Sequence, residues 1–241
     1  MISILPVAGL PEIGAGDDLA AMIVEAAALE DGDVVVVAHK VVSKAEGRVV
    51  RLADVEPSDR AQELAAGERD PRELEVILGE SVRVVRARAP LVIAQTRHGF
   101  VCASAGVDHS NAPEAGSVVL LPLDPDASAR RIRDGIAERS GRTVAVVVGD
   151  SFGRPFRHGT TDVAIGVAGL APLLDLRGTT DRGGRELRST QVAVGDELAA
   201  AADLARTKAG GVPVVLIRGL APAGEGAARE LVIEPERDLF R

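Results

Sequence analysis

A run of β-branched residues that ends in a dense polar stretch places the tightest constraint on the fold. Residues 143–148 read TVAVVV, a pattern typical of a buried strand, and residues 149–162 follow as GDSFGRPFRHGTTD. We expect a loop here that brings Asp150 and Ser151 to the edge of a sheet. Oxygen ligands for a divalent cation, with the arginines Arg154 and Arg157 behind them, suit a nucleotide phosphate. The alternative is a solvated polar loop between two strands.

Composition narrows the class of protein. The chain has 241 residues, 46% of them hydrophobic and 27% charged, which is typical of a soluble globular protein. A net charge of -8 and an aromatic content of 2% argue against nucleic-acid binding. The single Cys102 excludes an intramolecular disulfide and fits a reducing compartment. No signal peptide or membrane-spanning run is recognisable, so we expect a cytoplasmic protein without membrane association.

The order of predicted elements favours an α+β fold. We expect strands at residues 2–7, 34–38, 82–87, 91–95, 100–103, 143–148 and 213–217, and helices at 19–29, 57–80 in two pieces, 127–139 and 196–205. Strands mixed with helices and a hairpin turn at residues 96–99 favour a mixed sheet over a doubly wound one. The change from helical to strand patterns places a boundary between two lobes near residues 80–90.

Two further polar clusters follow predicted strands. Residues 39–48 (HKVVSKAEGR) bring Lys40 and Lys44 directly after a buried strand, but they lack the glycine-rich turn of a Walker loop. A solvated, charged strand end is the alternative interpretation. Residues 105–111 (AGVDHSN) bring Asp108 and Asn111 together, and we interpret the intervening His109 as an exposed loop residue.

Taken together, the three clusters supply carboxylates, a hydroxyl and lysines. Such a set suits Mg²⁺ bound with a nucleoside triphosphate, because the metal neutralises the phosphates and a cation stabilises a phosphoryl group in transfer. Spacing alone does not identify the group that would accept the phosphoryl.

Many ordered blocks of the chain resemble one known family, the coenzyme F420-0:L-glutamate gamma-glutamyl ligases, over nearly the whole length. The blocks are residues 9–11 (GLP), 16–19 (GDDL), 32–37 (GDVVVV), 42–48 (VSKAEGR), 105–108 (AGVD), 110–111 (SN), 123–126 (LDPD), 150–159 with Asp150, Gly153, Arg154, Arg157 and Gly159, 164–166 (AIG), 184–187 (GREL), 196–199 (DELA) and 215–219 (VLIRG).

The resemblance implies a reaction. The family adds L-glutamate to a side-chain carboxylate of the deazaflavin coenzyme F420-0 and releases GDP and phosphate. It uses GTP and a divalent cation, Mg²⁺ or Mn²⁺, with K⁺ as a further candidate. The implied route passes through an acyl phosphate, which the amine of glutamate attacks.

The resemblance also implies roles for residues. Asp108 and Asp150 would hold one metal, and Ser151, where relatives usually carry threonine, would help to hold a second. The residues implied in GTP binding are Leu10, Pro11, Glu12, Ile13, Lys44 and Asn111. The polar clusters themselves add Lys40, Arg154 and Arg157 to the expected nucleotide-binding set. We expect Asp108, Asp150 and Lys44 to be the residues that take part in catalysis.

The family fold is a two-lobed α+β chain that forms an intertwined homodimer. Residues 1–241 would form one such unit, and we consider that segment 195–241 returns to the first lobe. His39 stands where relatives often have a small hydroxyl residue, and Lys208 stands near a metal-binding acid of some relatives. These departures keep two alternatives open: a related carboxylate–amine ligase with another acceptor, and a non-catalytic nucleotide- or coenzyme-binding module.

Overall fold

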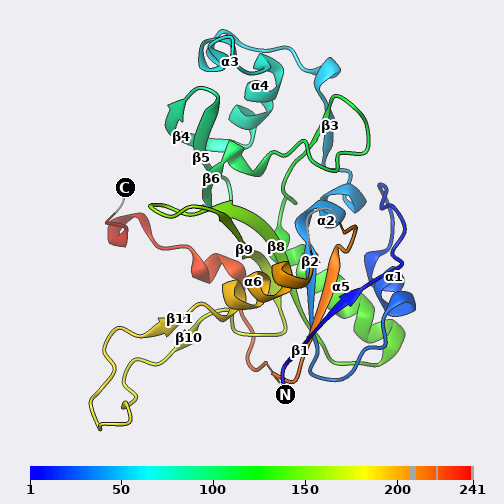
Figure 1. Cartoon of the computed structure of the whole chain (residues 1–241), viewed down its shortest axis with the longest axis vertical. Coiled ribbons are helices and arrows are strands. Elements are labelled where there is room, and N and C mark those ends of the chain that lie inside the picture. Colours follow the sequence, from blue (N-terminus) through cyan, green and yellow to red (C-terminus); the bar gives the residue numbers. More distant parts are fainter. Residues whose placement is uncertain (207–209, 221, 240–241) are drawn as a thin grey trace.

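A five-stranded mixed sheet forms the larger part of the fold, in the order β1-β12-β2-β8-β9 (Figure 1). Its strands are β1 (Ser3–Val7), β12 (Val214–Arg218), β2 (Val34–Ala38), β8 (Ala145–Gly153) and β9 (Thr160–Ala168). β2 and β8 pair in parallel, and the other neighbours pair antiparallel. The structure, a computed structural model, describes residues 1–206, 210–220 and 222–239. The expected mixed α+β fold is confirmed.

Helices cover both faces of this sheet. Successive side chains of each strand point to opposite faces, so both faces are apolar and require cover. Val35 and Val37 pack against α1 (Leu19–Ala26) and α5 (Pro125–Ser140) on one face. Val34 and Val36 pack on the other face against α6 (Val194–Arg206). Asp18 and Asp124 cap α1 and α5 by accepting bonds of 3.0 and 2.9 Å from the backbone N–H groups of Ala21 and Ala127.

A smaller unit lies at one end of the sheet, at the top of Figure 1. It contains α3 (Asp59–Ala65), α4 (Pro71–Gly79), β3 (Val49–Arg51), β7 (Ser117–Val119), and the sheet β4 (Ser81–Arg88), β5 (Leu91–Thr96) and β6 (Val101–Ala103). Leu74 and Ile77 of α4 share one hydrophobic cluster with Val92 of β5 and Val118 of β7. Residues 80–90, where we expect a lobe boundary, therefore lie inside this unit.

The chain leaves the large sheet after α2 (His39–Ala45) and rejoins it at α5. Near its end, α6 packs on the sheet and β12 inserts between β1 and β2. This part of segment 195–241 thus lies on the large sheet. Short 3₁₀ turns complete the path at η1 (Leu52–Asp54), η2 (Ser104–Gly106), η3 (Ala228–Leu231) and η4 (Pro235–Arg237).

One alternative interpretation and one local expectation differ from the structure. Residues 39–45 form the helix α2 rather than a charged strand end, because Val41 and Val42 turn inward to the core. The polar stretch after residue 148 is largely paired: β8 continues to Gly153 and β9 begins at Thr160, with a register shift at Val148/Gly149. A further antiparallel pair, β10 (Leu174–Asp175) with β11 (Gln191–Val192), projects from the body (Figure 1). Among the described residues, no helix is long and apolar enough to cross a lipid bilayer.

Candidate functional site

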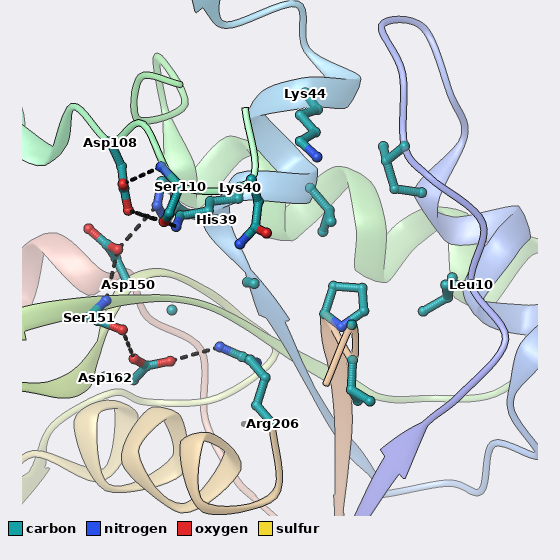
Figure 2. A pocket seen from close by; sticks show the side chains of 18 of the residues that line it. Leu10, His39, Lys40, Lys44, Asp108, Ser110, Asp150, Ser151, Asp162 and Arg206 are labelled. Carbon is teal, nitrogen blue, oxygen red and sulfur yellow. Dashed lines mark hydrogen bonds and ion pairs between the residues drawn. The ribbon is translucent and has the colours of Figure 1, made fainter. Parts of the chain in front are cut away.

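A cavity of about 680 Å³ opens where α2, the middle of β8 and the smaller unit meet. Most of the residues that the sequence predicts for the site line it, namely Leu10, Pro11, Glu12, Ile13, Lys40, Lys44, Asp108, Asn111, Asp150 and Ser151. His39, Ser110, Asp162, Asp203 and Arg206 also line it, and sequence reasoning did not select them. Figure 2 shows that these side chains come from several elements and face one space.

The parallel pair β2–β8 explains why distant polar residues meet. Ala38 ends β2, and its register partner Gly149 lies in the middle of β8, where the parallel pairing of the two strands stops. His39 and Asp150 follow them directly, so both emerge at the same edge of the sheet. Carboxyl ends of parallel strands are the usual position of ligand sites in such sheets.

Lys40 links the large sheet to the smaller unit. Its ammonium lies 2.7 Å from Asp108 Oδ2 and also contacts the Ser110 hydroxyl. The backbone N–H of Ser110 donates to Asp108 Oδ1 at 2.7 Å. Burial raises the pKa of the Asp108 carboxyl, but the hydrogen bonds from Lys40 and Ser110 outweigh it and hold that pKa below its usual value. Asp108 is therefore a carboxylate at neutral pH.

Lys44 brings a second amine to the cavity from the last turn of α2. The residue is buried, with 6% of its surface exposed, and its ammonium pairs with the carboxylate of Glu12. Glu12 belongs to the loop before α1, and its side chain is 78% exposed. Because the partner of this buried amine is exposed to solvent, an anionic ligand could replace it.

Asp150 has polar contacts on two sides. Its Oδ1 accepts the backbone N–H of Ser151 at 2.8 Å and lies 3.1 Å from His39 Nε2. His39 is 2% exposed, and its Nδ1 lies 3.4 Å from the hydroxyl of Ser43. The buried imidazole therefore contacts the Asp150 carboxylate and restricts its position.

Ser151, Asp162 and Arg206 form a chain along the cavity wall (Figure 2). The Ser151 hydroxyl donates to Asp162 Oδ1 at 2.5 Å, and Arg206 Nη1 donates to Asp162 Oδ2 at 2.7 Å. Burial raises the pKa of the Asp162 carboxyl, and the carboxylates of Asp203 and Asp150 act in the same direction. Because the Ser151 hydroxyl uses its hydrogen in the bond to Asp162, the lone pairs of its oxygen remain available to a cation.

Arg154 and Arg157 do not line the cavity. They lie between β8 and β9, where Arg154 Nη2 donates to the His158 carbonyl at 2.7 Å and Arg157 is exposed. His109 is half exposed at the surface, and its Nε2 lies 2.8 Å from Glu73. Lys208, singled out as a departure from the family, lies outside the described residues.

Two of the missed residues carry a sequence signal. Asp162 is a carboxylate inside the apolar strand pattern TTDVAIGV, and such a residue requires a partner. His39 follows β2 directly and is adjacent to Lys40, so it belongs to the same polar cluster. Arg206 has no comparable signal, because it ends an ordinary amphipathic helix.

The donors at the cavity fit a hard divalent cation. Asp108, Asp150 and Ser151 offer oxygen atoms, which Mg²⁺ and Mn²⁺ prefer. Across the described ranges, no three or more His, Cys, Asp and Glu side chains gather in a ready-made metal site. Mg²⁺ in nucleotide enzymes is commonly held by one or two carboxylates, with phosphate oxygens and water completing the shell. The donor set matches that mode.

Comparison with known proteins places the chain in a family. The family model for F420-0:Gamma-glutamyl ligase matches residues 9–219. A protein of Methanothermobacter thermautotrophicus named coenzyme F420:L-glutamate ligase is 46% identical over 100% of this chain and 99% of its own length. Proteins of the same name from Methanopyrus kandleri and Archaeoglobus fulgidus are 49% and 44% identical. They cover 94% and 100% of this chain, and 92% and 96% of their own lengths. The chain therefore belongs to the F420-0:gamma-glutamyl ligase family, whose members are ligases that form an amide bond.

Proposed function

We propose that this protein joins L-glutamate to a side-chain carboxylate of coenzyme F420-0 through an amide bond, with GTP as the source of energy. The observation that carries the proposal is the convergence of Lys40, Lys44, Asp108 and Asp150 on one cavity. Amines and carboxylates in that arrangement suit a nucleoside triphosphate with its divalent cation. The names of the relatives supply the substrates, coenzyme F420 and L-glutamate.

The reaction needs activation because a free carboxylate is a poor acyl donor. In the proposed first step, a carboxylate oxygen of the coenzyme attacks the γ-phosphorus of GTP, the bond to the β-phosphate oxygen breaks, and GDP leaves. The amine of glutamate then attacks the carbonyl carbon of the acyl phosphate. The carbon–oxygen bond breaks, phosphate leaves with its electron pair, and the nitrogen loses a proton as the amide forms.

The residues of the chain have separate roles in this scheme. Lys44 and Lys40 would bind the phosphates and offset the negative charge that develops on the transferred group. Asp108 and Asp150 would hold the divalent cation, and Ser151 would add a hydroxyl oxygen. When bound, that cation would polarise the phosphoryl oxygens as a Lewis acid. Leu10, Pro11 and Ile13 would contact the nucleotide from the loop before α1.

The test is mass spectrometry of F420-0 after incubation with the protein, L-glutamate, GTP and Mg²⁺ or Mn²⁺. A product heavier by glutamyl units, absent without GTP or metal, is the expected result. An unchanged coenzyme together with GTP-dependent modification of another carboxylic acid would favour the ligase with a different acceptor. Nucleotide binding with no product from any acceptor would favour the binding module.

The homodimer remains a prediction from the family resemblance. Light scattering on the purified protein measures it directly, since one chain has a mass of 24.9 kDa. A mass near twice that value is expected, and a monomer that turns over the coenzyme would contradict it.

A further inference from the structure

Arg206 has hydrogen-bonding capacity that the proposed function does not use. It is the last residue of α6, and its side chain reaches the wall of the cavity with 12% of its surface exposed (Figure 2). One nitrogen, Nη1, donates to Asp162 at 2.7 Å. The other two, Nε and Nη2, are buried and have no hydrogen-bond acceptor among the described residues. Buried donors without an acceptor are rare in folded proteins, because each one destabilises the fold.

The two remaining donors share one edge of the guanidinium plane. Nε–H and the nearer Nη2–H are parallel, which is the fork that binds two oxygens of one carboxylate or phosphoryl group. A lysine cannot make this paired contact, since its ammonium is a single point of charge. This edge of Arg206, which has no acceptor within the described part of the chain, therefore has the donor geometry that matches an oxyanion.

We propose that Arg206 binds an oxyanion of a substrate, a carboxylate or a phosphoryl group, through its Nε and Nη2 atoms. This inference rests on the proposed function for its choice of ligands, but the contact itself is argued from the cavity. Nothing in the resemblance assigns a role to Arg206.

The surroundings hold the guanidinium in place. Asp162 is 2% exposed and accepts a hydrogen bond from the Ser151 hydroxyl as well as from Arg206 Nη1. These contacts limit the rotation of the guanidinium group. Burial lowers the pKa of Arg206, while the charges of Asp162 and Asp203 raise it, and a guanidinium under these influences stays protonated at neutral pH. The side chain is thus a positive charge with a defined direction.

The local charge limits which anions can bind. Asp150, Asp162 and Asp203 line the same cavity and repel a free anion. Lys40, Lys44 and a divalent cation would offset that repulsion. The oxyanion that reaches Arg206 is therefore one that enters together with a cation, or one that carries a positive amine of its own.

The test measures binding, separately from turnover, by isothermal titration calorimetry of Arg206→Gln and Arg206→Lys. The probes are GTP with Mg²⁺, then L-glutamate and F420-0, each titrated in the presence of a non-hydrolysable GTP analogue and Mg²⁺. We expect Arg206→Gln to weaken one probe by about 10- to 100-fold, as for loss of hydrogen bonds to a charged group. Loss for GTP identifies a phosphoryl group, loss for L-glutamate identifies a carboxylate, and loss for F420-0 assigns the contact to the coenzyme. Arg206→Lys should recover only part of the loss.

Matched variants separate this effect from unfolding. Arg142→Gln removes a surface arginine that pairs with Asp31 at 3.3 Å, and it should bind every probe as the native protein does. The double variant Arg206→Gln/Asp162→Asn removes the buried negative charge that Arg206→Gln alone leaves without its ion-pair partner, and it should fold and show the same loss. A folded Arg206→Gln protein that binds all three probes within twofold of native would overturn the proposal. Absence of coenzyme turnover in the native protein, with Arg206-dependent binding retained, would instead overturn the ligase reaction.

Discussion

Lys40 and Asp108 form an ion pair of 2.7 Å that joins α2 to the smaller unit across the mouth of the cavity. The proposed function assigns Lys40 to phosphate and Asp108 to a divalent cation. The two side chains therefore neutralise each other in this ion pair. Binding of a nucleotide with its cation would exchange this one pair for two.

Removing the lysine should separate the two roles. In Lys40→Met, the affinity for Mn²⁺ alone is expected to rise by about two- to fivefold, because a partly exposed pair competes only weakly for Asp108. The affinity for GTP should fall. Calorimetric titration with Mn²⁺ and then with GTP measures both. Asp108→Asn removes the other partner of the pair and should lower the affinity for Mn²⁺. Weaker Mn²⁺ binding in Lys40→Met would contradict the assignment of Asp108 as a metal ligand.

A carboxylate change at Asp150 should affect chemistry more than folding. We expect Asp150→Ala to reduce turnover by at least about a thousandfold, since the cation would lose a ligand. The fold should persist, because Asp150 is held by the Ser151 backbone and His39 at the cavity rather than in the core. Product formation and thermal melting are the two measurements. Asp134→Ala, an exposed carboxylate on α5, should leave both unchanged; full activity in Asp150→Ala would contradict the metal assignment.

The sequence predicts the site better than its surroundings. The apolar strands before Lys40, Lys44, Asp108 and Asp150 indicate polar clusters, and the family resemblance indicates which of these residues act together; all four line the cavity. Arg154 shows the limit of that reasoning: the hairpin β8–β9 continues through the polar stretch and carries Arg154 beyond the cavity. Whether β8 continues past Asp150 depends on its partner strand β9 as well, so the residues near Asp150 do not predict the pairing by themselves.

Contacts between distant segments cannot be predicted from the local sequence for the same reason. Arg206 meets Asp162 only because α6 packs across β9, and a helix pattern does not specify which strand it covers. The smaller unit gives a second example. Leu74 on a helix and Val92 on a strand share one core, whereas the change of pattern between them resembles a domain boundary. Periodicity reports the local element and leaves its packing partner open.

The buried carboxylate of Asp33 should govern stability in acid. Burial raises its pKa, but two bonds of 2.8 Å from Arg218 and one from the Glu30 backbone outweigh burial and hold that pKa below its usual value. The pair therefore stabilises the fold fully above pH 3.8, the unfolded-state pKa of Asp, and the contribution is lost as pH falls through the lower folded value.

Arg218→Met leaves this carboxylate buried without its main partner. We expect the urea midpoint at pH 7 to fall by about 1 M, with the difference from native shrinking toward pH 3 as Asp33 is protonated. Urea titrations at pH 7, 5 and 3 measure it. Arg142→Met, at an exposed pair, is the control and should leave the midpoint unchanged. A constant difference at all three pH values would show that Arg218 acts by packing instead.

Two glycines of the β8–β9 hairpin should respond differently to a methyl group. A Cβ at Gly166 would lie 2.2 Å from the carbonyl oxygen of Pro125, where α5 begins, whereas a Cβ at Gly153 would meet nothing within 4 Å. Gly166→Ala is expected to cost at least about 2 kcal/mol in the free energy of unfolding, because backbone must shift. Gly153→Ala should be neutral. Chemical denaturation of both variants decides, and equal stability would contradict the close approach of α5 to β9.

The single cysteine reports on the packing behind the site. Burial raises the pKa of the Cys102 thiol to about 12, and the charge of Asp150 adds to the effect. Since the thiolate is the reactive form, iodoacetamide at pH 8 should modify the folded protein about a thousandfold more slowly than the urea-unfolded chain. Mass spectrometry over time measures the rates. In Asp150→Ala the folded rate should rise slightly, because one source of the raised pKa is gone. Rapid labelling of the folded native protein would mean that β6 opens readily and exposes Cys102, which is buried in the structure.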